Sequence, residues 1–314
     1  MTQAPAHASS PSATPSDDLV ATFQIEQQPA RGRIVRLGAV VDEILRRHDY
    51  PEPVANLLGE ACALAALVGS ALKFEGRLIV QAQGKGPVSY VVADYDTSGG
   101  LRGYCSFDAE RVAEAVAEAA KSFVRPGART LLGEGVFVMT VDPADMNDRY
   151  QGVTPIDGET LALCAETYFA QSEQVPTRVR LAVGEVHDAD GSAYRAGGMM
   201  IQNIAEDDAR GSTEDAWVRA QALFETLGED ELVDPLIPPE TLLYRLFHED
   251  GVRLYPAKPL RAYCRCSEDR VVGMLKSFPA ADIAEMTEPD GAIHVTCEYC
   301  SRVYAIPPET VEAE

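Results

Sequence analysis

The chain has little positive charge, few aromatic side chains and no long uninterrupted hydrophobic run. Its 314 residues carry 27 Lys and Arg against 49 Asp and Glu, which gives a formal net charge of −22. Binding to nucleic-acid backbones and to anionic membrane surfaces depends on Lys and Arg, so the composition argues against both partners. The hydrophobic content of 46% is nevertheless that of a globular protein and not of a disordered one.

Targeting signals are also lacking. Residues 1–18 have neither the basic region nor the apolar core of a secretory signal, and their Ala/Pro/Ser-rich composition predicts a disordered tail. The most apolar stretch, residues 54–72, is interrupted by Asn56 and Glu60 and is only weakly apolar, which favours a buried core helix over a membrane span. Without an export signal we expect a cytoplasmic protein whose cysteines are kept reduced.

The common catalytic motifs are missing as well. The stretch GKGPVS at residues 84–89 does not fit a phosphate-binding P-loop, and the chain contains neither a serine-nucleophile elbow nor an H-E-x-x-H zinc motif. We therefore expect a protein that is not an enzyme and does not use ATP.

Hydrophobic periodicity predicts a mixed fold for residues 19–204. Period-two alternation indicates strands at residues 19–28, 32–37, 76–84, 87–96, 100–108 and 135–142, and a hairpin of residues 177–187 and 193–204. Helical spacing is found at residues 38–49, 52–73, 109–121 and 158–174. Because strands and helices occur in runs and not in strict βαβ alternation, we assign an α+β fold.

Residues 205–258 predict a helical acidic linker. Ten acidic residues lie between residues 205 and 235, and only Arg210 and Arg219 oppose them. Apolar residues still recur at helical spacing, namely Trp217, Leu223, Phe224 and Leu227. One interpretation is a solvated helical linker; the other is a marginally stable segment that opens easily, because like charges repel and local apolar contacts are few. The sequence does not separate them.

Four of the seven cysteines lie in residues 259–314, spaced as C-x-C and C-x-x-C with thirty residues between the pairs; they are Cys264, Cys266, Cys297 and Cys300. Two closely spaced thiolate pairs supply the four soft ligands of tetrahedral zinc, and each doubling of the closing loop costs only about 0.6 kcal/mol. We therefore predict a zinc site with these four ligands. His294 is the rival ligand, but a lone histidine in an IHV strand is more typical of a half-exposed sheet residue.

The other three cysteines, Cys62, Cys105 and Cys164, lie in apolar patterns and are expected to be small buried hydrophobes.

Spacing alone favours a structural zinc site, but C-x-C and C-x-x-C also let neighbouring cysteines reach the separation of about 4.4–6.8 Å between Cα atoms that a disulfide needs. Oxidation could then close both pairs, expel the metal and unfold the module around it, which is a two-state switch. A thiol-disulfide oxidoreductase using Cys297 and Cys300 is the main rival, although no βαβ pattern surrounds them. A zinc-ribbon nucleic-acid module is disfavoured by the net charge.

Several stretches taken together resemble one known family, the redox-regulated heat-shock chaperones called the thirty-three-kilodalton chaperonin. The resemblance extends from about Phe23 to Tyr304. It is carried by LLGEACALAALVGSALKFEGRLIVQAQGKGPV, LRGY, RYQGVTP, LCAETYFAQSEQVPT, TLLYRLFHED and the closing YCRCS and TCEYC.

The resemblance implies an α+β N-terminal domain at residues 19–204, a helical linker at 205–258 and a zinc-binding redox-switch domain at 259–314. It further implies an ATP-independent holdase that binds unfolding client proteins and prevents their aggregation during oxidative or heat stress. Such a protein is inactive when reduced and zinc-bound, with all four cysteines as ligands. It becomes active, as a homodimer with an unfolded linker, when Cys264–Cys266 and Cys297–Cys300 disulfides form.

One residue departs from the family pattern. Arg265 occupies the position between the first two cysteines, where the family often has a small residue. We expect its guanidinium to lie beside the two thiolates and to favour their charged form.

Overall fold

The structure, a computed structural model, describes residues 17–27, 30–73, 75–145, 148–188, 191–203 and 214–312. Most of the predicted N-terminal tail, the centre of the predicted turn at residues 188–191 and the first part of the predicted acidic linker, up to residue 213, lie outside the described residues.

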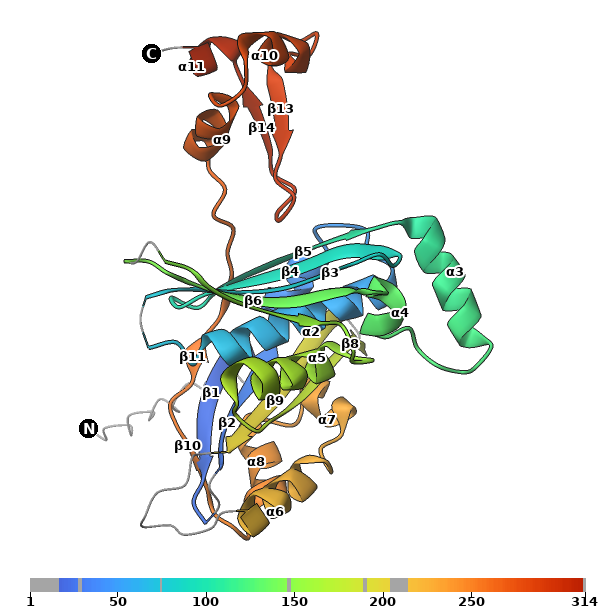
Figure 1. Ribbon diagram of the computed structural model, residues 1–314, viewed down its shortest axis with the longest axis vertical. Coiled ribbons are helices and arrows are strands. Elements are labelled where there is room, and N and C mark those ends of the chain that lie inside the picture. The colour runs from blue at the N-terminus through green and yellow to red at the C-terminus, as the bar shows by residue number, and fades with distance from the viewer. Residues whose placement is uncertain are drawn as a thin grey trace, which may run out of the picture.

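Two six-stranded sheets form the body of the protein (Figure 1). Sheet A is entirely antiparallel in the order β10-β1-β2-β9-β8, with β11 also pairing with β1. Its strands are β1 (Leu19–Ile25), β2 (Ala30–Leu37), β8 (Thr177–Asp188), β9 (Gly191–Asn203), β10 (Val252–Leu254) and β11 (Lys258–Pro259).

Sheet B has the order β12-β5-β4-β3-β6-β7, and all its pairs are antiparallel except β12 with β5. Its strands are β3 (Gly76–Gly84), β4 (Val88–Asp96), β5 (Gly100–Phe107), β6 (Gly135–Pro143), β7 (Tyr150–Pro155) and β12 (Arg261–Ala262). The mixed helix and sheet architecture confirms the predicted α+β class.

Helix α2 (Glu52–Gly69) lies between the two sheets (Figure 1). It begins after Pro51, and leucine and alanine cover it on nearly every side, so it can pack against both sheets at once. By length and composition alone α2 could cross a membrane, yet 72% of it is buried inside the protein. The prediction of a core helix is confirmed.

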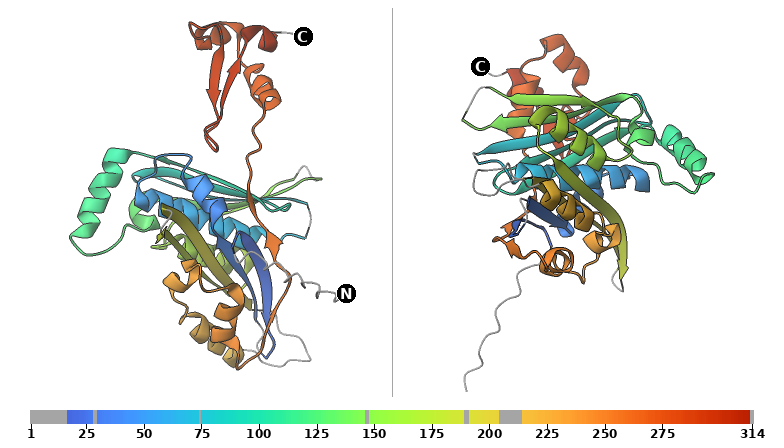
Figure 2. Two further views of the ribbon diagram at one scale, coloured as in Figure 1. Left: turned by 180° about the vertical axis from the view of Figure 1, so that it is seen from behind. Right: turned by 60° about the horizontal axis from the view of Figure 1, so that its bottom comes forward.

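The remaining helices of the body lie around this core. Helix α3 projects from one edge of the molecule, and Val112 is its one buried residue (Figures 1 and 2). Asp108 caps its N-terminus by accepting bonds from two backbone N–H groups. The elements are α1 (Ala39–Leu45), α3 (Ala109–Ala120), α4 (Ala128–Leu132), α5 (Leu161–Tyr168) and the π-helical turn η1 (Phe169–Glu173).

Three helices from the predicted linker cover the face of sheet A that points away from α2 (Figure 1). They are α6 (Glu214–Phe224), α7 (Glu229–Val233) and α8 (Pro239–Phe247). Trp217, Phe224 and Phe247 pack there against Phe23 and Ile34 of the sheet, and all five side chains are buried. The solvated-linker interpretation is therefore wrong for the described part of this segment, and its apolar contacts are not few. The helical apolar spacing belongs to the face that packs on the sheet.

Buried arginines of sheet A reinforce this packing. Arg36, only 1% exposed, donates hydrogen bonds to the carbonyls of Asp234 at 2.5 Å and Ile237 at 2.8 Å. Arg195 donates to the carbonyl of Val233 at 2.8 Å. These guanidinium groups satisfy backbone oxygens at the end of α7, which has no further helical turn to bond them.

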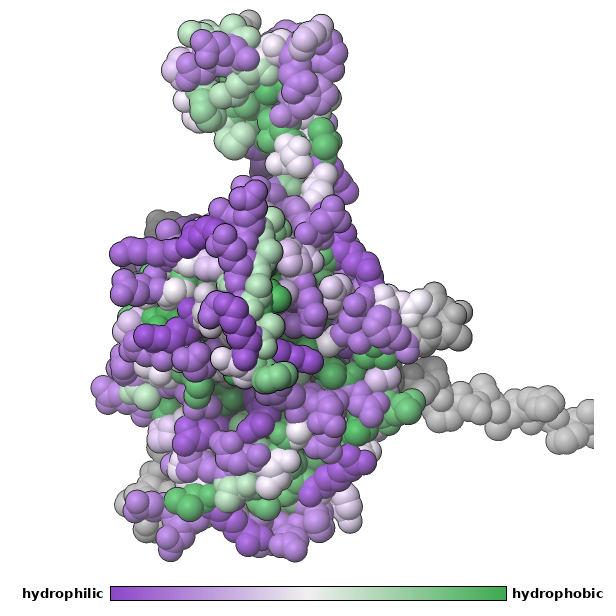
Figure 3. Space-filling model, turned by 90° about the vertical axis from the view of Figure 1, so that its right-hand side faces the viewer, coloured by the Kyte–Doolittle hydropathy of each residue, from purple (hydrophilic) through white to green (hydrophobic). Residues whose placement is uncertain are grey.

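The chain then enters a small C-terminal module, residues 264–312, which forms a separate lobe (Figures 1 and 3). It consists of α9 (Glu268–Leu275), α10 (Ala280–Met286), the hairpin β13 (Ile293–Thr296) and β14 (Val303–Ile306), and α11 (Pro308–Glu312). Its apolar core contains five buried residues, which are Leu275, Ile283, Ile293, Ile306 and Val311. The lobe is thus much less well supplied with apolar contacts than the body.

Candidate metal centre

The first cysteine pair lies in an extended segment between the body and the module. Cys264 and Cys266 follow β12, which pairs with β5 of sheet B. Directly after them Ser267 caps helix α9, its side chain accepting a hydrogen bond from the N–H of Arg270 at 3.3 Å. The two thiols are therefore fixed between a sheet on one side and a helix N-terminus on the other.

The second pair occupies the turn of the β13–β14 hairpin. The N–H of Cys297 donates to the carbonyl of Arg302 at 2.9 Å, and the N–H of Ser301 donates to the carbonyl of Cys297 at 2.8 Å. Ser301 has a φ of 57°, so the chain turns sharply through the left-handed region just after Cys300. This tight turn directs both thiols to the same side.

All four predicted ligands come together. Their sulfur atoms lie within 4.8 Å of one another, and all four residues are half-buried. The shortest approaches run between the pairs, at 3.7 Å from Cys264 to Cys297 and 3.4 Å from Cys266 to Cys300. Tetrahedral zinc with Zn–S bonds of about 2.3 Å has sulfur atoms about 3.8 Å apart, so both the donor set and its spacing fit this metal.

The four thiols are not electrostatically equivalent. Burial raises the pKa of Cys300 to about 12 and also raises that of Cys297, whose sulfur is partly compensated by the backbone N–H groups of Cys300 and Tyr299. Burial acts on Cys266 in the same direction, but hydrogen bonds from Tyr304 and the neighbouring thiols outweigh it and lower its pKa to about 7. The Tyr304 hydroxyl lies 3.1 Å from the Cys266 sulfur. Of Cys266, Cys297 and Cys300, Cys266 is therefore the most easily ionised without metal.

The cysteine turn also contacts the body of the protein. The guanidinium of Arg102 lies over the ring of Tyr299, 3.9 Å from its centroid, and Asp94 holds that guanidinium from the other side at 2.5 Å. The ring of His48 bonds the carbonyl of Glu298 at 2.7 Å, and the Ser301 hydroxyl donates to the carbonyl of Arg47 at 2.8 Å. Sequence reasoning missed these contacts. The aromatic residue inside C-x-x-C was visible, but nothing in the sequence identifies Arg102 as its partner.

Arg265, the residue between the first two cysteines, has charged neighbours in the body. Its side chain faces the body, where it lines a cavity of about 580 Å³ together with Arg77 and Asp96. Burial and the neighbouring Arg77 lower its pKa, whereas Asp96 raises it. That Arg265 favours the charged form of the neighbouring thiolates stays a prediction.

The remaining predictions for ligand residues agree with the structure. His294 lies on β13 and bonds Asp290 at 2.8 Å, apart from the sulfur cluster. Cys62, Cys105 and Cys164 are no more than 2% exposed and are part of the apolar core of the body. All seven cysteines are free thiols.

The fold and the thiol cluster together define an α+β protein that carries a four-cysteine metal-binding module at its C-terminal end. The family model of the Hsp33 protein matches residues 18–307. The 33 kDa chaperonin of Caulobacter vibrioides is 71% identical over 292 residues, covering 93% of this chain and 95% of its own length. That of Pseudomonas fluorescens is 37% identical over 293 residues, covering 92% and 91%.

The crystal structure of the 33 kDa chaperonin of Thermotoga maritima has the same fold, with a TM-score of 0.75 at 24% identity over 94% of this chain and 97% of that one. The chain belongs to the Hsp33 family, which confirms the resemblance found in the sequence. Membership of this family supports a chaperone function.

Proposed function

We propose that the protein is a redox-regulated, ATP-independent holdase of the cytoplasm that binds unfolding client proteins and prevents their aggregation during oxidative or heat stress. The reduced, zinc-bound form is inactive. Formation of the Cys264–Cys266 and Cys297–Cys300 disulfides removes the zinc ligands and activates the protein, which then acts as a homodimer.

The observation that carries this proposal is the convergence of four thiols in a module with a very small core. Bound zinc would hold the four sulfurs as thiolates and cross-link the extended segment to the β13–β14 turn. With only five buried apolar side chains, the module depends on this cross-link for its fold. Loss of the ligands is therefore expected to unfold it.

The redox step balances with a two-electron oxidant such as hydrogen peroxide. Two thiolates of one pair lose two electrons and form one S–S bond, while one peroxide molecule takes up these electrons and two protons and becomes two waters. Two peroxide molecules therefore oxidise both pairs. The within-pair arrangement is supported by the short chain between the partners, since one or two intervening residues let a disulfide close without long rearrangement.

Activation requires an apolar surface that the reduced form hides. The face of sheet A under α6–α8 provides one, because Phe23, Ile34 and Met199 are buried there against the acidic segment. This segment continues through β10, β11 and β12 directly to Cys264. Unfolding of the module would release the end of that connection, and opening of the segment would expose the sheet face to unfolding chains.

The test uses purified, zinc-loaded protein treated with peroxide at raised temperature. We expect zinc release, measured with a chromogenic chelator, together with suppression of a client's aggregation without ATP. Mass mapping should find the two within-pair disulfides. Zinc release without any effect on aggregation would exclude regulation by this centre.

Ligand assignment has its own control. The double change of Cys297 and Cys300 to Ser should abolish tight zinc binding, whereas Cys105→Ala, at a buried cysteine of the body, should retain one zinc per chain. Retained stoichiometric zinc in the double variant would show that the ligands are assigned wrongly.

A further inference from the structure

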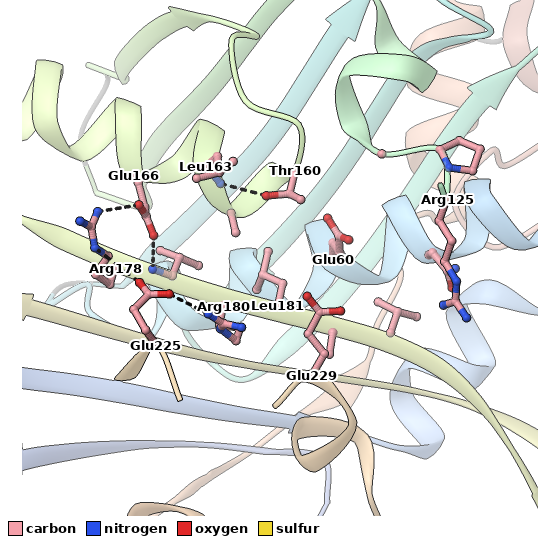
Figure 4. A pocket seen from close by; sticks show the side chains of 17 residues that line it. Glu60, Arg125, Thr160, Leu163, Glu166, Arg178, Arg180, Leu181, Glu225 and Glu229 are labelled. Atoms are coloured by element: carbon pink, nitrogen blue, oxygen red, sulfur yellow. Dashed lines mark hydrogen bonds and ion pairs between the residues drawn. The ribbon is translucent and has the colours of Figure 1, made fainter. Parts of the chain in front are cut away.

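A second site lies in a cavity of about 570 Å³ that is lined by no residue of the C-terminal module. Helix α2, the N-terminus of α5, strand β8 and the acidic residues around α7 form its walls (Figure 4). This volume lies within the range of about 300–1,000 Å³ that small-ligand sites occupy. We call it the Glu60 cavity, after the carboxylate at its centre.

Two of the four carboxylates in the Glu60 cavity are already neutralised. Glu166 pairs with Arg178 at 2.9 Å and accepts the N–H of Val179 at 2.8 Å, and Glu225 pairs with Arg180 at 2.9 Å. Figure 4 draws these pairs on one side of the cavity. They account for Arg178 and Arg180, so neither cation is left for the remaining acids.

The other two carboxylates, Glu60 and Glu229, lie in the same part of the cavity (Figure 4), near enough for Glu229 to raise the pKa of Glu60, to which burial contributes most. Among the described residues no cation forms an ion pair with either of them, and Arg125 stands apart at the edge. Burial and the neighbouring Glu229 raise the pKa of Glu60, and the backbone N–H of Leu161 opposes this shift only in part. One N–H leaves most of the hydrogen-bonding capacity of the Glu60 carboxylate unused.

A third acceptor lies one helical turn before Glu60. Residues four apart on a helix lie on the same face, so Asn56 and Glu60 are neighbours on α2. The Oδ1 atom of Asn56 is buried without a hydrogen-bond donor among the described residues. A buried acceptor without a donor is costly, and it marks a place where a donor from outside the chain would be favoured.

The unsatisfied groups therefore consist of acceptors alone, and the ligand must be a donor with positive charge. A metal ion is disfavoured, since among the described residues the carboxylates of this cavity belong to no group of three His, Cys, Asp or Glu ligand atoms within 4.8 Å of one another. A primary ammonium carries three donors and one charge. Leu181, Val183 and Ala162 supply apolar wall for an attached alkyl chain. We propose that the Glu60 cavity binds a small alkylammonium ligand, of which a linear diamine is the simplest example.

Such a ligand connects two parts of the protein. Asn56 and Glu60 belong to the central helix, whereas Glu229 begins α7 in the acidic segment. A diamine held between them would strengthen the contact between the segment and the body. The proposed function holds that activation opens this segment, and on that basis the ligand would oppose activation.

The experiment is calorimetric titration of 1,4-diaminobutane into full-length, reduced, zinc-loaded protein at about pH 8, with uncharged 1,4-butanediol as the ligand control. We expect saturable one-to-one binding of the diamine and none of the diol. Glu60→Gln and Glu229→Gln should each weaken binding about 10- to 100-fold, since each removes one charged hydrogen bond to the ammonium. Glu229 is exposed, so its variant is expected to fold normally.

Glu134→Gln is the matched control, because this exposed glutamate lies outside the cavity and pairs only with Lys85 at 3.9 Å. It should bind the diamine like the parent protein. Equal weakening in all three variants would show general attraction to an acidic protein and overturn the site, as would tighter binding of inorganic phosphate. Since the titration involves neither oxidation nor a client, its failure leaves the proposed function untouched, and failure of the activation experiment leaves the cavity untouched.

Discussion

Helix α2 alone buries thirteen of its residues between two sheets, whereas the entire C-terminal module, residues 264–312, has five buried apolar side chains in its core. The body is therefore held by burial, at about 1.5–3 kcal/mol for each large apolar side chain. A module of this size cannot rely on burial alone, and natural domains near this limit commonly need a metal or disulfides. The comparison explains how one chain can contain a body that is held by apolar burial and a module whose fold depends on a metal or on disulfides.

The two regions also use their cysteines differently. Burial raises the pKa of Cys62 to about 12, and this thiol serves as apolar filling between helix and sheet. In the module, by contrast, four half-buried thiols have their sulfur atoms within 4.8 Å of one another. The same side chain is buried apolar filling in one environment and, under the proposed function, a metal ligand with redox chemistry in the other.

Removing zinc under reducing conditions tests the comparison most directly and has the largest expected effect. Structural zinc contributes about 10–16 kcal/mol in small sites, so a strong chelator should unfold the module while the body stays folded. Hydrogen exchange should show lost protection in β13 and β14 and unchanged protection in α2 and β3. Continued protection of the β13–β14 hairpin after stoichiometric zinc removal would mean that its small core suffices.

A pH titration sharpens the comparison from the side of the body, because the central helix of the body carries an ionisable acid that lines a cavity. Burial raises the pKa of Glu60 to about 7 from its ordinary value of 4.5, so the folded protein holds this proton more tightly than the unfolded chain. The contribution of protonated Glu60 to the free energy of unfolding is therefore complete below pH 4.5 and is lost as the pH rises through 7. The loss amounts to about 3 kcal/mol.

Glu60→Gln should remove this pH dependence. The free energy of unfolding of the variant minus that of the parent protein is expected to increase by about 1–2 kcal/mol between about pH 6 and about pH 8.5. Urea denaturation, followed at α2, measures this difference. The groups facing Glu60 are Asn56, Cys164, Glu229 and the backbone of Leu161, and the variant leaves all of them in place. A constant difference across this range would show that Glu60 ionises in the folded protein as it does in the unfolded chain.

Much of the fold could be predicted from local patterns because local forces determine it. Strand β3 has the predicted bounds, residues 76–84, and α3 ends one residue before the predicted helix does. Strand β7 escaped prediction because its residues are largely exposed and show no alternation. Strands β10, β11 and β12 are too short to carry a period.

The packing of α6–α8 could not be predicted, because a helix pattern shows that an apolar face exists but not what covers it. Sheet A gave a misleading signal here. Arg36 on β2 suggests a solvent-facing side, yet it is buried under the acidic segment. Likewise, cysteine spacing predicted the thiol cluster, since chain connectivity alone brings each pair together. The position of the module on the body depends on long-range contacts that no local pattern encodes.

The smallest expected effect concerns the contact that joins the two regions, between Tyr299 and Arg102. A cation–π pair contributes about 0.5–2 kcal/mol, so Tyr299→Ala should loosen the module from the body without releasing zinc. The readout is the rate of tryptic cleavage after Arg261, which lies in the short strand β12 leading to the cysteines. Tyr299→Phe keeps the ring and is the control with little expected change.

A double-mutant cycle identifies the interaction itself. Because Arg102→Ala removes the same pair from the other side, the double variant with Tyr299→Ala should be cleaved little faster than either single variant, with a coupling energy of about 0.5–2 kcal/mol. Additive effects would mean that ring and guanidinium do not interact in solution. The module would then be held to the body by the hydrogen bonds of His48 and Ser301 and by the covalent chain. Strand β12, which pairs with β5, would be the last element before the cysteines that belongs to the stably folded body.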